Sequence, residues 1–419
     1  MQRISSFLLP FVLMLAWTSG TVSGADADVI EVRVSLPADV VGPPTLTGLQ
    51  EACRHLSEKD PPAAAAALRR AAEGIQATVL GKNLIAAANA VTRPAGRFTP
   101  VSERGEIGSD PFFVLRSPGK KQPPEGFFCR PLPREENWMI QYLEDPSRLR
   151  EDLPERMSGV TADMSALPRV HMVDLVVAEA PGRLSAWVNH PADPGMVVVF
   201  RNLVSAYCDQ RLKKLGELVL AEPWSKKVDA KALEWLVAIT RVAHGLGPVA
   251  LEQETGKGMV SVASRLEDKA LPVEAVKAEG LALIAGLRLA EAEKDLGVSA
   301  AGFTATFVIY LLDRVRGFSG DASNPFAVIE RQLIKEGGIR LDLQSGRVIP
   351  DRRKLKAAMT KMLKRMVRSQ GSGSDADAQD FFAPKEKADG DEDPFIRSIP
   401  APIAGFKLVT KNPDPVVGK

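Results

Sequence analysis

Cysteine and histidine are scarce in this 419-residue chain, which contains three cysteines and four histidines. The cysteines are Cys53, Cys129 and Cys208, and none belongs to a Cys-x-x-Cys pair or has metal-ligand spacing from a histidine. An odd number of widely spaced cysteines defines no disulfide framework. An oxidising compartment would permit one bridge, but we expect buried or unpaired thiols because cysteine is often buried.

An excess of charge of one sign is also absent, since 54 basic residues face 52 acidic ones and the net charge is +2. This balance gives no global indication of nucleic-acid binding. Aromatic residues make up only 6% of the chain, and alanine-rich amphipathic segments are frequent. These features predict a mainly α protein with a small β portion, in one large domain or two. No stretch after the N-terminal region is apolar over the length of a transmembrane helix, so no transmembrane segment is expected.

The first 27 residues resemble an export signal. Gln2 and Arg3 provide a positive start, Phe7 to Trp17 an apolar run, and residues 23–27 a set of small residues suited to cleavage. The sequence therefore predicts a signal peptide at 1–27, a mature start near Asp28, and a secreted or periplasmic protein.

Hydrophobic periodicity predicts the following elements. Strands are expected at 29–36, 168–177, 184–189 and 196–200, and a β-hairpin at 339–348. Helices are expected at 48–56, 62–80, 83–91, 137–143, 145–157, 203–220, 230–244, 273–293, 300–318, 324–335 and 352–369. Residues 93–133 are rich in proline and glycine, which predicts a long irregular, strand-poor connection. The last helix is basic, with Leu355, Met359, Met362 and Met366 on one apolar stripe.

Composition shifts divide the chain into five parts. The predicted parts are a signal peptide (1–27), an N-terminal helical region with an irregular connection (28–160), a helical domain with a short sheet (161–370), a flexible acidic linker (371–395), and a C-terminal tail packing back on the domain (396–419). The acidic run at 389–393 lacks EF-hand spacing, so a solvated linker is preferred over a calcium site.

The stretch at 237–248 reads Val-Ala-Ile-Thr-Arg-Val-Ala-His-Gly-Leu-Gly-Pro. It resembles the His-Glu-Ile-Ser-His-Gly-Leu-Gly-Pro motif of the dipeptidyl-peptidase III family of zinc exopeptidases and its bacterial relatives. A second stretch, Asn189 to Asp193, resembles the Asn-x-Pro-Asn-Asp turn of the bacterial members, with Ala192 in place of the second Asn. Similarity extends from about Leu167 to Phe406. The resemblance implies the helical lobe of a gluzincin-like peptidase with a short β-sheet beside the cleft.

The family's zinc chemistry is missing from the matching positions. A zinc helix of this kind needs imidazoles at i and i+4 and a Glu at i+1, but these positions read Thr240, Arg241 and His244. The third ligand corresponds to Ala275, and a histidine that assists the transition state corresponds to Ser323. These five positions are therefore vestigial, and no catalytic residue is predicted.

Zinc is not expected as a cofactor. A catalytic site needs three protein ligands, and a fixed positive charge at Arg241 would repel a divalent cation. The remaining metal candidates are His244 and Glu274. His55, His171 and His190 do not share the helix face. A simpler interpretation makes His244 a helix-end histidine that contacts terminal carbonyls.

The vacated pocket suggests a role for Arg241. We hypothesise that Arg241 pairs with Glu252, Glu254 or Glu274 where the metal would lie. A retained cleft would then bind a peptide or protein.

Three functions remain open. The preferred hypothesis is a secreted pseudoenzyme, not an enzyme, that binds peptide or protein near Asn189, His190 and Asp193 by strand addition, as the resemblance implies. The alternatives are an active zinc exopeptidase with a rearranged metal site, and a helical interaction scaffold without peptidase ancestry. The sequence indicates no oligomeric state.

Overall fold

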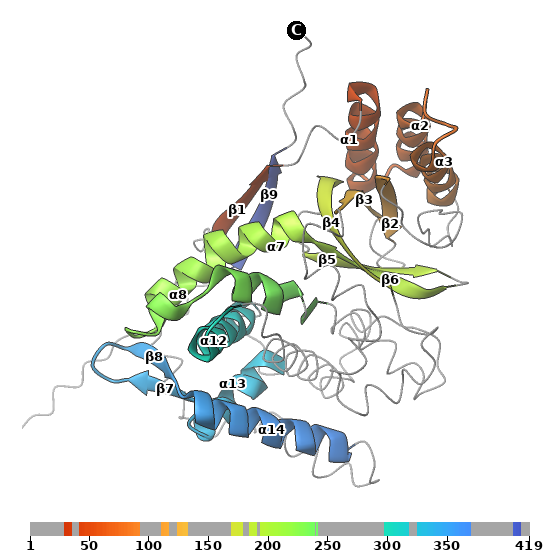
Figure 1. Ribbon diagram of the computed structural model, residues 1–419. Coiled ribbons are helices and arrows are strands. Elements are labelled where there is room, and N and C mark those ends of the chain that lie inside the picture. Colours follow the sequence, from red (N-terminus) through yellow and green to blue (C-terminus); the bar gives the residue numbers. More distant parts are fainter. Residues whose placement is uncertain are drawn as a thin grey trace, which may run out of the picture.

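The structure is a computed structural model in which helices predominate and a small sheet lies among them (Figure 1). It describes residues 29–35, 42–92, 110–116, 124–132, 169–178, 184–190, 193–238, 240–241, 297–317, 325–369 and 405–411. The predicted signal peptide, the helices predicted at 137–143, 145–157 and 273–293, and the predicted acidic linker lie outside these residues.

A five-stranded sheet forms the centre of the molecule. Its strand order is β2-β3-β4-β6-β5, so β2 and β5 are its two ends. The pairs β2–β3, β3–β4 and β5–β6 are antiparallel, whereas β4 and β6 run parallel. The strands are β2 (Phe112–Arg116), β3 (Glu125–Pro131), β4 (Arg169–Ala178), β5 (Ser185–His190) and β6 (Asp193–Phe200).

The prediction of a strand-poor connection at 93–133 is wrong at β2 and β3. Each strand has two consecutive phenylalanines that face opposite sides of the sheet. Phe113 and Phe128 pack into the core formed with the N-terminal helices, whereas Phe112 and Phe127 pack into the core on the other face. Strands covered on both faces read as continuous apolar runs rather than as an alternating pattern. The sheet also joins strands from both sides of the predicted boundary at residue 160.

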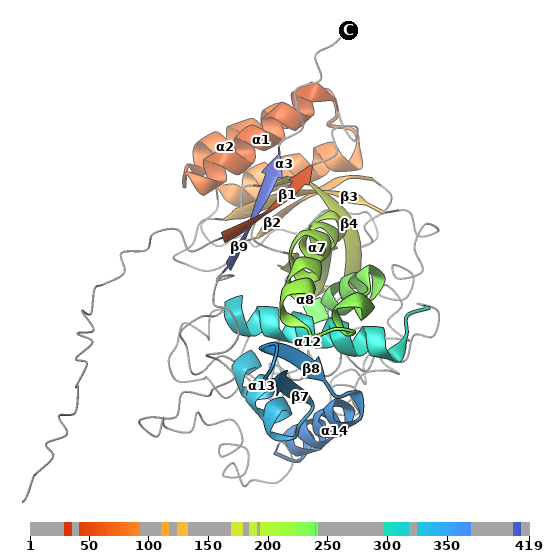
Figure 2. The same cartoon turned by 90° about the vertical axis from the view of Figure 1, so that its left-hand side faces the viewer.

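Three helices cover one face of this sheet (Figures 1 and 2). They are α1 (Pro43–Ser57), α2 (Pro61–Ala71) and α3 (Val79–Val91). The predicted helix at 62–80 is therefore wrong in its second half. The chain turns after Ala71 through Gly74, whose φ of +80° suits glycine. Thr78 then caps α3 by accepting a hydrogen bond from the backbone N–H of Gly81.

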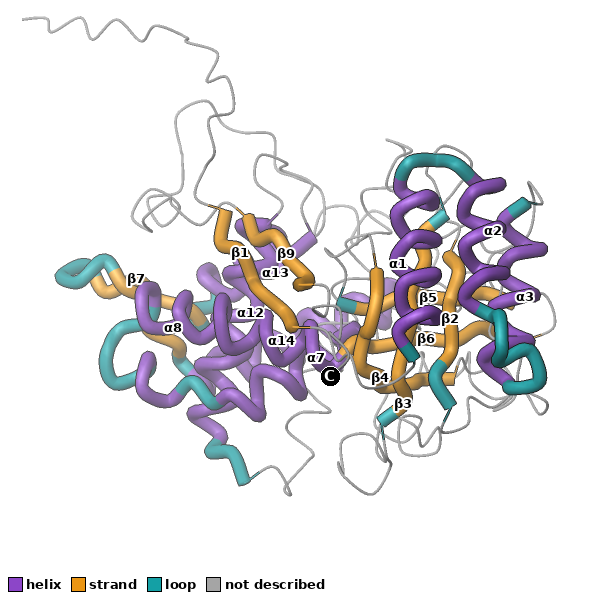
Figure 3. Tube along the Cα trace, turned by 90° about the horizontal axis from the view of Figure 1, so that it is seen from above, coloured by secondary structure: helices purple, strands orange, loops and turns teal. Residues whose placement is uncertain are grey.

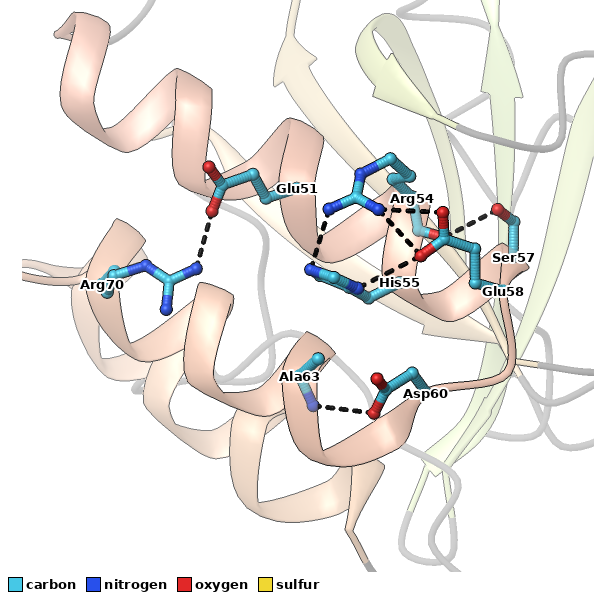
Figure 4. Close-up of polar contacts among 8 residues, drawn as sticks. All are labelled: Glu51, Arg54, His55, Ser57, Glu58, Asp60, Ala63 and Arg70. Atoms are coloured by element: carbon cyan, nitrogen blue, oxygen red, sulfur yellow. Dashed lines mark hydrogen bonds and ion pairs between the residues drawn. The ribbon is translucent and has the colours of Figure 1, made fainter.

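Polar contacts line the exposed side of α1 and α2 (Figure 4). Arg70 of α2 donates to Glu51 of α1 at 2.6 Å, and within α1 Arg54 binds both carboxylate oxygens of Glu58 at 2.8 Å. Asp60 caps α2 through the backbone N–H of Ala63. These ion pairs are solvent-exposed, so close packing of small residues between the two helices contributes more to their association.

The other face of the sheet is covered by α7 and further helices of the main core. A continuous helical stretch consists of α7 (Arg201–Tyr207), a π-helical segment (Cys208–Leu212) and α8 (Lys213–Val219). The helical residues 230–238 and 240–241 follow, and then α12 (Ala300–Gly317) and α13 (Pro325–Lys335). The predicted hairpin forms from β7 (Ile339–Asp342) and β8 (Arg347–Pro350), and α14 (Arg352–Ser369) follows it. Leu355 and Met359 of the predicted apolar stripe are buried.

The two ends of the described chain meet in a separate parallel pair. Strand β1 (Val29–Ser35) pairs with β9 (Gly405–Lys411) along its whole length (Figure 3). The side chain of Gln210, in the π-helical segment, accepts from the backbone N–H of Arg33 and donates to its carbonyl, both at 2.9 Å. This contact attaches the pair to the main helical body.

All three cysteines are free and buried. Burial raises the pKa of the Cys129 and Cys208 thiols well above their usual value. The nearby Cys53 adds to the shift of Cys129, and Glu234 adds to the shift of Cys208. The expectation of buried, unpaired thiols is thus met. Within the described residues, no helix has the length and apolar character that a membrane span requires.

The contact between α1 and α2 yields a stability prediction. A Cβ added at Gly48 would lie 2.8 Å from the Cβ and 2.9 Å from the Cα of Ala71. We expect Gly48→Ala to lower the free energy of unfolding by about 1–2 kcal/mol, because overpacking outweighs the helix propensity of alanine. Urea denaturation measures this change.

The matched control is Thr47→Ala, at the exposed neighbouring position of α1. Its effect should stay within about 0.5 kcal/mol. Equal stability of Gly48→Ala and the wild type would contradict the close approach of these helices.

Candidate functional site

The helical residues 230–238 and 240–241 include the first part of the stretch 237–248 that resembles the zinc-peptidase motif. The helix begins after Asp229, whose carboxylate accepts from the backbone N–H of Ala232 at 3.0 Å. Its apolar side chains, including Trp235, are fully buried in the main core. Glu234 accepts a 2.5 Å hydrogen bond from Ser205 of α7. The helix is therefore held firmly where its last described residues meet α12.

Thr240 occupies the position of the first zinc-binding imidazole in the resemblance, and it is buried with 4% of its surface exposed. Its Oγ1 lies 2.8 Å and 2.9 Å from the carbonyl oxygens of Leu236 and Val237, which are both on its own helix. The same oxygen lies 3.0 Å from the hydroxyl of Tyr310 on α12. Thr240 is thus a core residue whose polar group is satisfied within the protein.

In the resemblance, Arg241 occupies the position of the family's general base. Its Nη2 donates to the hydroxyl of Tyr310 at 3.3 Å. The hydroxyl of Tyr310 therefore contacts both Thr240 and Arg241. The predicted partners Glu252, Glu254 and Glu274 lie outside the described residues, and that pairing stays a prediction.

One turn along α12 from Tyr310, a buried ion pair links α12 to the helical stretch at 201–219. Arg211 donates from Nε to Asp313 at 2.5 Å, and the two side chains are only 1% and 3% exposed. The hydroxyl of Tyr207 donates to the other carboxylate oxygen of Asp313. Burial, followed by the nearby Asp313 and Tyr310, raises the pKa of Tyr207 well above its usual value. The phenol therefore keeps its proton at neutral pH and remains a donor.

Most other predicted site residues cannot be placed. His244, Glu274, Ala275 and Ser323 lie outside the described residues. His55 lies on α1, within 3.3 Å of Glu58, and His171 lies in β4. Among the described residues, no group of three or more His, Cys, Asp or Glu side chains is arranged to hold a metal ion.

The predicted peptide-binding residues lie at one end of the sheet. Asn189 and His190 are the last two residues of β5, and Asp193 is the first residue of β6, where it pairs with His190. The register shifts between Val188 and His190, so Asn189 lies at an irregularity of the ladder. Strand β5 ends the sheet order, and within the described part of the chain no strand pairs with its outer side, although β2, at the other end of the order, lies close to β5. Such an edge leaves backbone N–H and C=O groups that an extended peptide can use.

A second polar cluster fixes the helix that follows β6. Asp174 of β4 is buried and accepts from Arg130 at 2.9 Å and from Arg201 at 3.0 Å. The side chain of Asn202 bonds both the N–H and the C=O of Leu175, at 3.0 Å and 2.9 Å. Beyond the end of β6, the side chain of Asn202 thus makes the hydrogen bonds to β4 that a paired strand would make. These bonds position α7 against the sheet.

Tyr310, Asp313 and Arg211 were not predicted as site residues. One signal was available, because Asp313 and Arg314 interrupt the otherwise apolar run of α12. A carboxylate in such a helix requires a buried partner. The partner itself lies 102 residues earlier, so sequence spacing could not identify it.

The buried pair yields a second stability prediction. We expect Asp313→Asn to lower the free energy of unfolding by about 3–5 kcal/mol, because Arg211 is left buried without its counter-charge. The double variant Arg211→Met with Asp313→Leu should recover at least half of that loss, since it removes both charges. Urea denaturation of the two variants measures the difference in their free energies of unfolding. If both variants lose the same amount, the unpaired charge of Arg211 is not the main cause of the loss.

Two solved structures share this fold. The DPP III structure from Caldithrix abyssi matches with a TM-score of 0.60 and 17% identity, over 83% of this chain and 70% of that one. The dipeptidyl-peptidase III structure from Corallococcus sp. strain EGB matches with a TM-score of 0.58 and 17% identity, over 82% of this chain and 66% of that one. The chain matches no protein-family profile and no curated protein. It therefore has a DPP III-like fold and spans about two thirds of the length of these two proteins.

Proposed function

We propose that this chain is a secreted, non-catalytic relative of the DPP III peptidases that binds extended peptide or protein segments. The observation that carries the proposal is the environment of Thr240. Its hydroxyl is buried and lies within hydrogen-bond distance of two helix carbonyls and Tyr310. A satisfied core hydroxyl is a poor substitute for the imidazole that a zinc ligand position requires.

The charge at Arg241 supports the same conclusion. A general base for water activation must accept a proton, whereas a guanidinium stays protonated throughout the physiological range. A cation bound nearby would also be repelled by it. The contact between Arg241 and Tyr310 gives the side chain a structural role in holding the helix against α12.

Strand β5 supports the binding part of the proposal. A sheet edge next to a bulge-like irregularity can add a peptide strand through backbone hydrogen bonds, with neighbouring side chains providing selectivity. Asn189, His190 and Asp193 are the proposed contacts, because they surround the end of this strand.

The main alternative is an active zinc exopeptidase in which His244 and Glu274 contribute to a rearranged site. The DPP III-like fold is compatible with both hypotheses and favours them over a helical scaffold without peptidase ancestry. Export after cleavage of residues 1–27 remains part of the proposal.

Metal content separates the two peptidase-derived hypotheses. We expect the purified protein to contain no stoichiometric zinc by elemental analysis, and added zinc to leave its melting temperature unchanged, since a ligand that does not bind cannot stabilise the fold. It should release no product from unblocked peptides, as judged by mass spectrometry. The His244→Ala variant should behave identically in all three measurements. Stoichiometric zinc that disappears in His244→Ala would establish the rearranged site instead.

Peptide capture tests the proposed edge. We expect immobilised protein to retain members of a degenerate pool of unblocked hexapeptides, and to lose them when alternate backbone nitrogens are methylated, because strand addition requires those N–H groups. Asn189→Ala should weaken the binding of retained peptides about three- to ten-fold, the value of one hydrogen bond.

The control is Asn89→Ala, which changes an exposed asparagine on α3. It should leave binding unchanged. Retention that is indifferent to N-methylation would refute strand addition.

A further inference from the structure

Residues 325–369, which form α13, the β7–β8 hairpin and α14, concentrate positive charge. They contain twelve basic and four acidic residues, a net charge of +8, whereas the whole chain has a net charge of +2. In Figures 1 and 2 these elements lie at the end of the molecule opposite α1–α3. We call residues 325–369 the basic end.

The exposed charges of the basic end are all positive. Every charged side chain that is classed as exposed among its described residues is Lys or Arg: Arg331, Lys335, Arg340, Arg352, Arg353, Lys354, Lys356 and Lys361. The excess positive charge therefore extends into solvent from α13, the hairpin and α14 together.

The four carboxylates offset only four of the twelve positive charges, and each of them has partners within the basic end or is buried. Glu330 is buried. Glu336 accepts from Lys361 at 2.6 Å and from Gln332 at 3.0 Å. Asp342 accepts from Ser345 and the backbone of Gln344 in the hairpin turn, and these hydrogen bonds lower its pKa. Asp351 caps α14 through the backbone N–H of Lys354.

The apolar side of α14 is already occupied, because Leu355, Ala358 and Met359 are buried in the main core. Leu355 and Met359, the described residues of its apolar stripe, are therefore not available to another surface, whereas Arg352, Arg353, Lys354 and Lys356 are exposed. The described surface of the basic end would therefore contact a partner mainly through its positive charges.

Two exposed leucines lie beside this charge. Leu343, 89% exposed, lies in the turn of the hairpin, and Leu218, 59% exposed, lies on α8. They are the large apolar side chains that stand out as exposed in the described part of the chain. The two elements touch, since Leu220 bridges Val348 of β8 and Ala221 donates to the carbonyl of Val348 at 2.9 Å.

We propose that the basic end docks on an anionic lipid surface, with Lys and Arg side chains at the headgroups and Leu343 and Leu218 entering the interface. Basic clusters bind anionic membranes with roughly five-fold gain in affinity per residue near the surface. Exposed leucines beside such a cluster add the apolar contact that a purely electrostatic nucleic-acid site does not need. This inference is independent of the peptide-binding proposal.

Cosedimentation with vesicles tests the proposal. The protein used begins near Asp28, so that the apolar run Phe7–Trp17 does not contribute, and this removes none of the described residues. We expect binding to vesicles containing phosphatidylglycerol, no binding to pure phosphatidylcholine vesicles, and loss of binding when salt shortens the Debye length to about 3 Å.

The decisive variant replaces Arg340, Arg352 and Arg353 by Gln. None of these three exposed side chains forms an ion pair with another described residue. We expect affinity for phosphatidylglycerol vesicles to fall about 100-fold, following the gain per basic residue.

The matched control makes the same charge change at the opposite end, with Lys59→Gln, Arg69→Gln and Lys82→Gln in α1–α3 and the turn after α1. Its affinity should equal that of the wild type. Replacing Leu343 and Leu218 by Ser should weaken binding about ten-fold, because apolar contact is lost.

Three outcomes would overturn the proposal. An equal loss in both triple variants would mean that net charge alone governs binding. Indifference to the leucine replacements, together with displacement by duplex DNA, would identify a general polyanion site. Binding that appears only after Asp389, Asp391, Glu392 and Asp393 are replaced by Asn or Gln would show that the chain's own acidic residues occupy the basic end.

Discussion

The buried carboxylate of Asp313 is the interaction on which the arrangement of the helices depends. A charge at 2% exposure is unfavourable unless it is paired and hydrogen-bonded. Arg211 and Tyr207 supply both requirements from the helical stretch at 201–219. They fix the position of α12, and α12 in turn places Tyr310 against Thr240 and Arg241. The positions of Thr240 and Arg241 relative to α12 thus depend on a structural ion pair.

Under the proposed function, this dependence explains how a DPP III-like fold keeps its architecture without a metal. A catalytic zinc contributes free energy to the elements that ligate it, so its loss must be offset by other contacts. Here a hydroxyl network between Thr240, Tyr310 and Arg241 connects the same helix to α12. The Arg241 side chain adds a donor, and Thr240 buries only a small, satisfied polar group. Under the proposed function, these polar contacts hold the helix against α12 in place of the metal coordination of a DPP III peptidase.

The sequence predicted much of the fold, with failures that have identifiable physical causes. Strands β4 and β6 contain runs rich in valine, and helices α12, α13 and α14 have apolar residues at helical spacing. Their predicted ranges, and that of β5, agree with the structure to within a few residues. Strands β2 and β3 were missed because Phe112–Phe113 and Phe127–Phe128 face two cores, so no alternation marks them. The break after Ala71 was missed because alanine and leucine persist across a turn that only Gly74 and Thr78 indicate. Tyr310 could not be assigned to the site, since its contact with Thr240 spans 70 residues of sequence.

The helical stretch at 201–219 serves two distant contacts from one short segment. Tyr207, at the end of α7, and Arg211, in the π-helical segment, both reach Asp313, while Gln210 reaches the backbone of β1. Tyr207 and Arg211 are four residues apart, so they lie on one face of the stretch, whereas Gln210 lies on another. The body of the protein therefore holds α12 on one side of this stretch and the β1–β9 pair on another.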